Sequence, residues 1–173
     1  AGAVLGWAYS APPLRLMTRG AGELTVGCVW ALIVLGSDVV FRGAWDASVW
    51  WAALGYGACI ANVLLINAYS DATADAQVGK RTAVVRLGPQ RAAVLYVLLC
   101  LSAYGALVGG VWTNALPSYA FGALLGLPTT VVACVGLWRH AHAPQKLRLA
   151  IVCTISTAVL YGLGLSVGCV WGA

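Results

Sequence analysis

Five long apolar runs decide what this chain can fold into. They occupy residues 24–41, 50–68, 92–112, 115–138 and 149–171. An α-helix rises about 1.5 Å per residue, so roughly 20 apolar residues cross the hydrocarbon core of a bilayer. Each run is close to that length, and backbone polar groups in lipid must be satisfied within a helix or a closed barrel. The sequence therefore predicts an all-α, polytopic bundle of transmembrane helices.

The composition leaves no room for a separate soluble domain. Only 9% of the 173 residues are charged and 61% are hydrophobic, whereas soluble domains carry about 25% charged residues. We therefore expect residues 1–173 to form a single transmembrane domain. The opening apolar run, residues 1–8, is too short to span a bilayer, so we expect it to be the end of a sixth helix that begins upstream.

The basic residues predict the orientation of the bundle. Nine of the ten Lys and Arg residues lie in segments 9–23, 69–91 and 139–148, and only Arg42 lies in the alternate connections. The positive-inside rule places those three segments in the cytoplasm. This topology accounts for the net charge of +5 without nucleic-acid binding. We expect an integral protein of a bacterial or archaeal inner membrane.

Several residues inside the spans are expected to serve packing. Pro128 should kink the fourth span, and Asp38 should pair with Arg42 at the outer end of the first span. Three glycines favour close helix packing, namely Gly105, Gly109 and Gly110. Four polar residues are expected to hydrogen-bond between helices or to backbone: Asn62, Thr154, Ser156 and Thr157.

The cysteines and histidines do not form a recognisable metal motif. The six cysteines lie in apolar runs, with no CxxC pair, so we expect them to pack as small hydrophobic residues. His140 and His142 are two residues apart and are expected to belong to a basic cytoplasmic loop. Ligation of haem or of a chlorophyll magnesium is the alternative for these two histidines.

One segment concentrates the polar chemistry of the chain. Asn67, Asp71 and Asp75 are spaced four residues apart, so they share one face if the helix continues through them. Two carboxylates one turn apart repel each other unless a cation lies beside them, and Mg²⁺ prefers such oxygen ligands. Gly79 then allows a turn, and Lys80 follows it. Carboxylates followed by cations are the pattern that a metal-bound diphosphate ester requires.

The basic residues of this segment have two interpretations. Lys80, Arg81, Arg86 and Arg91 either bind phosphate or act only as determinants of topology. The aspartates are different, because the chain has only five acidic residues and two of them lie one turn apart near the membrane. Ionisable groups in such places are expensive and tend to be functional.

The segment from Asn67 to Gly88 resembles a known motif. Its form, N-x3-D-x3-D-x3-GKRT followed by VRLG, resembles the second aspartate-rich motif of the UbiA superfamily of intramembrane prenyltransferases. The likeness is greatest to the menaquinone-type branch and its uncharacterised relatives. Residues 9–22, YSAPPLRLMTRGAG, followed by Glu23, look like the cytoplasmic loop before the fifth span of these enzymes. The resemblance covers the chain nearly end to end and implies the C-terminal part of a nine-helix fold.

The resemblance also implies an activity. Enzymes of this superfamily transfer a polyprenyl group from a prenyl diphosphate to an aromatic or other lipid-pathway acceptor, with Mg²⁺ as cofactor. Carried onto this sequence, Asp71 and Asp75 would be the catalytic metal ligands. Lys80 would be catalytic by neutralising the leaving diphosphate.

Further residues are implied to bind the diphosphate. Asn67 would orient the aspartates, and Arg81 would assist Lys80. Tyr9 and Arg15 would correspond to the tyrosine and the basic residue of the earlier loop, with Arg19 as the alternative to Arg15. The expected partners are therefore a polyprenyl diphosphate, an acceptor substrate and the lipid bilayer.

The sequence departs from the superfamily pattern in two respects. The first aspartate-rich motif, NDxxDxxxD, is absent, and the charge pattern places Asp38 and Asp46 on the opposite side of the membrane. Ala68 and Ser70 also replace residues that are usually polar or bulkier. The alternative is therefore a non-catalytic structural subunit, docked with other membrane subunits in a larger complex. A transporter is a third alternative, although no inverted repeat or pair of broken helices is evident.

Overall fold

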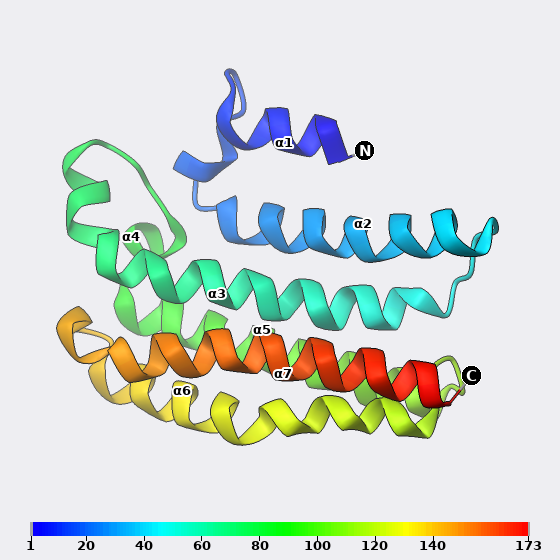
Figure 1. Ribbon diagram of the computed structural model, residues 1–173. Helices are drawn as coiled ribbons and strands as arrows, with labels where there is room; N and C mark the ends of the chain where they lie inside the picture. The colour runs from blue at the N-terminus through cyan, green and yellow to red at the C-terminus, as the bar shows by residue number, and fades with distance from the viewer. Residues whose placement is uncertain (1, 173) are drawn as a thin grey trace.

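Five helical segments of membrane-spanning length run side by side in the computed structural model, which describes residues 2–172 (Figure 1). The α-helices are α1 (Gly2–Ser10), α2 (Gly22–Arg42), α3 (Val49–Gln77), α4 (Ala83–Leu87), α5 (Pro89–Trp112), α6 (Leu127–His140) and α7 (Arg148–Trp171). Three 3-10 helices complete the order, namely η1 (Leu16–Thr18), η2 (Ser118–Gly126) and η3 (Pro144–Lys146). The described part of the chain contains no β-strand. The all-α transmembrane bundle is therefore confirmed, with α1 as the short helix at its start.

The helix α3 is longer than its apolar run. The run ends at residue 68, but the helix continues to Gln77. No glycine or proline interrupts residues 69–77, and alanine and glutamine are good helix formers. The two aspartates of the predicted motif therefore lie on a continuous helix and not in a loop.

The helices pack in an order that groups the basic segments. Helix α2 packs against α3, α3 packs against α5 and α7, and both α6 and η2 pack against α7. The connections 11–21, 78–82 and 141–147 lie at one end of the bundle, and the connections 43–48 and 113–117 lie at the other (Figure 1). We call these the basic end and the opposite end. The grouping agrees with the predicted topology, and the side of the membrane that each end faces stays a prediction.

Glycines allow close helix contacts at several crossings. At the crossing of α2 and α3, a Cβ on Gly27 would lie 2.9 Å from the carbonyl oxygen of Gly57, so only hydrogen fits there. Gly109 and Gly110 lie against the ring and Cβ of Trp51, as expected for close packing. The same expectation is wrong for Gly105, which has no atom within 4 Å of its would-be Cβ.

The fourth span changes its helix type before the proline. Residues Ser118–Gly126 form the 3-10 helix η2, and α6 begins at Leu127. Pro128 lies in the first turn of α6, where its missing N–H is not needed by the helix. The predicted irregularity is therefore present, but it lies on the N-terminal side of Pro128 and not at a kink within an α-helix.

Polar groups inside the bundle bond as the sequence predicts. The Asn62 amide donates to the carbonyl oxygen of Tyr96 at 3.1 Å and to the Cys100 sulfur at 3.2 Å. Thr154 pairs with the Tyr96 hydroxyl at 2.7 Å, and Thr157 pairs with Thr129 at 2.8 Å. These bonds link α3, α5, α6 and α7, and the role of Ser156 stays a prediction.

All six cysteines are free. Five of them are buried or half-buried, which agrees with the packing role expected for them. Cys28 is exposed on α2, so the expectation of packing within the chain is wrong for this residue.

Candidate functional site

The last four turns of α3 carry a buried face and an exposed face. Leu65 and Tyr69 are fully buried, and the Tyr69 hydroxyl donates to the carbonyl oxygen of Pro89 at 2.6 Å. This bond ties the end of α3 to the start of α5. Asn67 and Asp71 are about 200° around the helix from Tyr69, and both are exposed. Packing of one face therefore turns the polar face outward.

A tight turn after α3 returns the chain toward its own carboxylates. Gly79 has a φ of +74°, a left-handed conformation that glycine adopts without strain. The backbone N–H of Lys80 then donates to the carbonyl oxygen of Asp75 at 2.8 Å. The Lys80 ammonium nitrogen lies 3.1 Å from Asp75 Oδ1 in a partly buried ion pair. The turn therefore positions Lys80 beside the second aspartate of the motif.

Two long-range hydrogen bonds join the segment after this turn to the loop before α2 and to the first turn of α2. The backbone N–H of Arg81 donates to the carbonyl oxygen of Thr18 at 3.1 Å. The backbone N–H of Ala83 donates to Glu23 Oε1 at 3.2 Å. Glu23 is only 3% exposed, so its carboxylate is a buried anchor between the two segments. Both sequence motifs are thereby held against each other at the basic end.

Residues of both motifs enclose a small cavity of about 70 Å³, which we call the acidic cavity. Its lining residues are Tyr9, Met17, Gly22, Glu23, Leu64, Asn67, Ala68, Asp71, Asp75, Lys80 and Thr82. A water molecule needs roughly 10–15 Å³ of such space. The acidic cavity therefore has room for a cation with a few waters but not for an isoprenoid chain.

The charges around the acidic cavity favour a cation. Its three carboxylates belong to Glu23, Asp71 and Asp75, and its one ammonium belongs to Lys80. Three negative charges and one positive charge leave a formal charge of −2. Among residues 2–172, the buried hydroxyl oxygen of Thr82 also has no hydrogen-bond partner, and an unpaired buried polar atom is costly. The cavity thus offers both uncompensated charge and a free hydroxyl.

The carboxylates of the acidic cavity suit a Mg²⁺ ion whose remaining ligands are waters and substrate phosphates. Within residues 2–172, no three acidic, histidine or cysteine side chains are grouped closely enough to hold one metal ion. Mg²⁺ is commonly bound by one or two carboxylates, with waters and substrate phosphates completing its shell. Asp71 and Asp75, one helical turn apart, can supply that pair.

The structure brings together five of the seven residues predicted to form the site. Tyr9, Asn67, Asp71, Asp75 and Lys80 all line the acidic cavity. The other two predicted residues lie outside the cavity.

Arg15 and Arg81 lie outside the acidic cavity. Arg15 is exposed and has a left-handed backbone, with φ of 43°. Arg81 is exposed and lines a larger hollow of about 730 Å³ together with Lys80 and Arg86. Arg19, the alternative to Arg15, donates from its guanidinium to the carbonyl oxygen of Pro13 at 2.7 Å. Roles of these arginines in diphosphate binding stay predictions.

Two polar lining residues, Glu23 and Thr82, have no role predicted from the sequence. Glu23 lies 60 residues from its partner Ala83, so its part in the cavity becomes evident only in the fold. The sequence feature that singles out Glu23 is that the chain has only five acidic residues. The sequence feature that singles out Thr82 is its place at the end of the GKRT stretch.

In the part of the chain that the structure describes, the two histidines belong to no group of three potential metal ligands. His140 is half-buried at the end of α6, and His142 is exposed in the connection that follows. Their position at the basic end agrees with the expected basic loop, and ligation of a haem or chlorophyll magnesium stays an untested alternative.

Comparison with known proteins identifies one related family. A model of the UbiA prenyltransferase family matches residues 1–152. No curated protein and no solved structure gives a significant match. The matched range contains every residue that lines the acidic cavity.

Proposed function

The chain belongs to the UbiA prenyltransferase family, and we propose that it forms one half of a Mg²⁺-dependent site for a polyprenyl diphosphate. Membership of this family supports prenyl transfer as the general type of activity, and the five apolar helices make the chain an integral membrane protein. The finer proposal is that the acidic cavity binds the diphosphate end of the donor. The acceptor would be an aromatic or other lipid-pathway molecule.

One observation carries this proposal. Two segments about 50 residues apart in the sequence, residues 9–23 and 67–82, meet around a cavity with a formal charge of −2. A diphosphate is itself an anion, so it can approach this cavity only with a cation between them. A divalent cation held by Asp71 and Asp75 satisfies both partners.

The residues of the chain then have distinct roles. Asp71 and Asp75 hold Mg²⁺, which supplies charge neutralisation to the diphosphate when it is bound. Lys80, released from its ion pair with Asp75, donates to a diphosphate oxygen. Tyr9 and Thr82 line the same cavity, and their hydroxyls can donate hydrogen bonds to the leaving group.

The reaction breaks one bond to the allylic carbon and forms another. The bond between the allylic carbon and the diphosphate oxygen breaks, and the electron pair leaves with the diphosphate. A nucleophilic atom of the acceptor bonds to that carbon and then loses a proton. Stabilisation of the departing charge is the contribution that this half of the site makes.

A matched set of variants tests the proposal. In the full-length protein, Asp71→Asn and Asp75→Asn should each lower Mg²⁺-dependent prenyl transfer by at least about 100-fold, the size of a lost electrostatic contact. Thr73→Asn is the control, because Thr73 is exposed on the same helix and does not line the cavity. Undiminished turnover in both aspartate variants would remove the assignment.

The same assay distinguishes the interpretation of the protein as an enzyme from its interpretation as a non-catalytic structural subunit. A non-catalytic subunit predicts no prenyl transfer by the wild-type full-length protein under any donor and acceptor tested. It also predicts that the aspartate variants still assemble with the membrane partner. Turnover above background in the wild type would contradict the subunit interpretation.

A further inference from the structure

A second and larger cavity lies at the opposite end of the bundle. It has a volume of about 940 Å³, within the range of small-molecule sites. It lies between α2, α3, α7 and the connection 113–117. About 19 residues of α3 separate Ala52 in its wall from Asp71, which amounts to roughly 28 Å of helix. The cavity is therefore distinct from the acidic cavity.

The wall of this cavity is apolar toward the middle of the bundle. Val34, Tyr56, Val159 and Leu163 line it there. Tryptophans surround the same end of the bundle, including Trp45 and Trp50, whose rings meet edge to face with centroids 5.9 Å apart. Tryptophans gather at the boundary between lipid and water. The cavity thus runs from the headgroup level into the hydrocarbon region.

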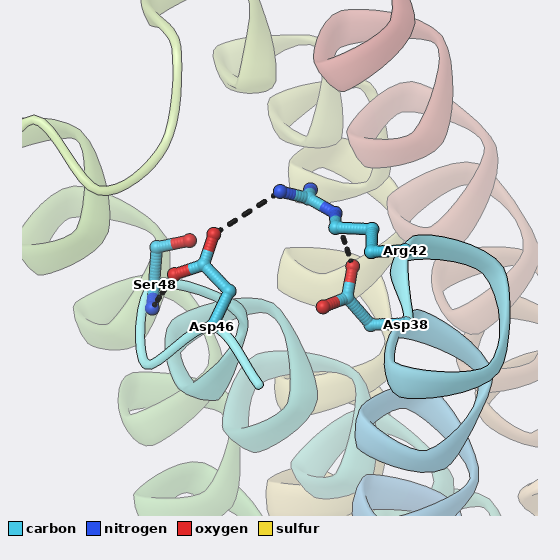
Figure 2. A network of polar contacts seen from close by, with 4 residues as sticks. All are labelled: Asp38, Arg42, Asp46 and Ser48. Carbon is cyan, nitrogen blue, oxygen red and sulfur yellow. Dashed lines mark hydrogen bonds and ion pairs between the residues drawn. The ribbon is translucent and has the colours of Figure 1, made fainter. Parts of the chain in front are cut away.

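Three charged side chains form the polar mouth of the cavity, and Figure 2 shows their contacts. The Arg42 Nε lies 2.7 Å from Asp38 Oδ1, and its Nη1 lies 3.1 Å from Asp46 Oδ2. The predicted pair of Asp38 and Arg42 is thereby confirmed, with Asp46 as a second carboxylate. Two carboxylates and one guanidinium leave a formal charge of −1.

Asp46 is held in place by the start of α3. The backbone N–H of Ser48 donates to Asp46 Oδ1 at 2.8 Å. This bond, followed by the Ser48 hydroxyl and the nearby Arg42, keeps the pKa of Asp46 below its usual value. Asp46 therefore stays ionised at neutral pH, and its attachment to Arg42 persists.

Two polar groups in the mouth lack full partners. The Asp38 Oδ2 atom is buried and has no hydrogen-bond partner within the described chain. Arg42 has five N–H donors, of which two serve the ion pairs, and its side chain is 59% exposed. A buried carboxylate oxygen requires a donor, while the remaining guanidinium N–H groups suit a phosphate. A headgroup with a donating cation and a phosphate satisfies both.

We propose that this cavity is a lipid site that selects a phospholipid with a primary ammonium headgroup. The ammonium would donate to Asp38 Oδ2, the phosphate would lie on Arg42, and an acyl chain would occupy the apolar wall. A choline headgroup has no N–H to donate, and an anionic headgroup is repelled by the charge of −1. This inference does not depend on the prenyltransferase proposal.

The test measures lipid retention by the purified full-length protein. Native mass spectrometry after equilibration with mixed micelles of detergent and phosphatidylethanolamine, phosphatidylcholine or phosphatidylglycerol should show retention of phosphatidylethanolamine at least about fivefold above the other two. The Asp38→Asn variant should lose that preference. Ser37→Asn is the control, because Ser37 is the exposed neighbour and does not line the cavity.

A second variant tests the proposal independently, so that the test does not depend on the folding of Asp38→Asn alone. Leu163→Trp fills the apolar wall without changing the charge, and Leu163 is 60% exposed, so the larger ring does not disturb a packed core. It should lower retention of the bound lipid by a similar factor. Equal retention of the three lipids by the wild type, an unchanged preference in Asp38→Asn, or undiminished retention in Leu163→Trp would overturn the proposal. Equal retention of the three lipids is the result expected if another segment of the full-length protein occupies the cavity.

Discussion

Glu23 shows how much a single buried carboxylate determines at the basic end. It contributes charge to the acidic cavity and also accepts the backbone N–H of Ala83. Lys80 and Thr82 precede that N–H in the same short connection. At the scale of the residue, the site therefore depends on one side chain that is fixed at the first turn of α2. The residues of the GKRT stretch are positioned from a distant part of the chain.

Replacing Glu23 should destabilise the fold as well as the site. Glu23→Ala leaves the buried Ala83 N–H without its acceptor, which costs about 1–3 kcal/mol. Glu23→Gln retains an amide oxygen and should cost less. Thermal unfolding in detergent micelles measures the difference, with Leu24→Ala as the control, since Leu24 is exposed. An unchanged unfolding midpoint for Glu23→Ala would contradict the anchoring role.

Helix α3 combines two functions at the scale of the element. Its apolar part packs against α2, α5 and α7, and its last three turns carry the polar face of the acidic cavity. The close contact of Gly27 with Gly57 sets the spacing of α2 and α3. That spacing places the start of α2, with Glu23, opposite the end of α3, with Asp71.

A glycine pair tests this contact. Gly27→Ala brings a Cβ to 2.9 Å from the Gly57 carbonyl oxygen, so the helices must separate, at a cost of about 1–3 kcal/mol. Gly36→Ala lies on the same helix and meets no atom within 4 Å, so it should be neutral or stabilise by up to about 1 kcal/mol. The unfolding midpoint should fall for Gly27→Ala and should stay unchanged or rise for Gly36→Ala. Equal shifts would contradict the close-contact account.

The extents of the helices were predictable to different degrees. Apolar runs located all five spans, because hydropathy alone separates lipid-embedded residues from connections. The end of α3 was not located, because residues 69–77 are polar enough to leave lipid and still compatible with helix. The position of Glu23 beside Ala83 was not predictable, because it depends on how α2 and α3 cross. The failed expectations for Gly105 and Cys28 share one cause, since periodicity alone did not reveal which side of a helix faces lipid.

At the scale of the whole molecule, charge is divided between two ends. The basic end carries the acidic cavity and nine of the ten Lys and Arg residues, and the opposite end carries Arg42 with Asp38 and Asp46. The positive-inside rule predicts that the basic end faces the cytoplasm. The donor diphosphate would then enter from the cytoplasm.

Cysteine labelling tests this orientation. Gln145→Cys lies at the basic end and Ala47→Cys at the opposite end, and both positions are exposed. A membrane-impermeant maleimide applied to intact cells should label Ala47→Cys above the unmodified parent, whereas Gln145→Cys should react only after the membrane is permeabilised. The reverse pattern would contradict the predicted topology.

The central claim is that Asp71 and Asp75 hold Mg²⁺ for a diphosphate, and calorimetric titration of the full-length protein tests it most directly. A polyprenyl thiodiphosphate, which resists transfer, should bind in the presence of Mg²⁺ and lose at least about tenfold in affinity without it. The Asp71→Asn/Asp75→Asn double variant should show the weaker affinity in both conditions. Equal affinity with and without Mg²⁺, or wild-type affinity in the double variant, would contradict the account.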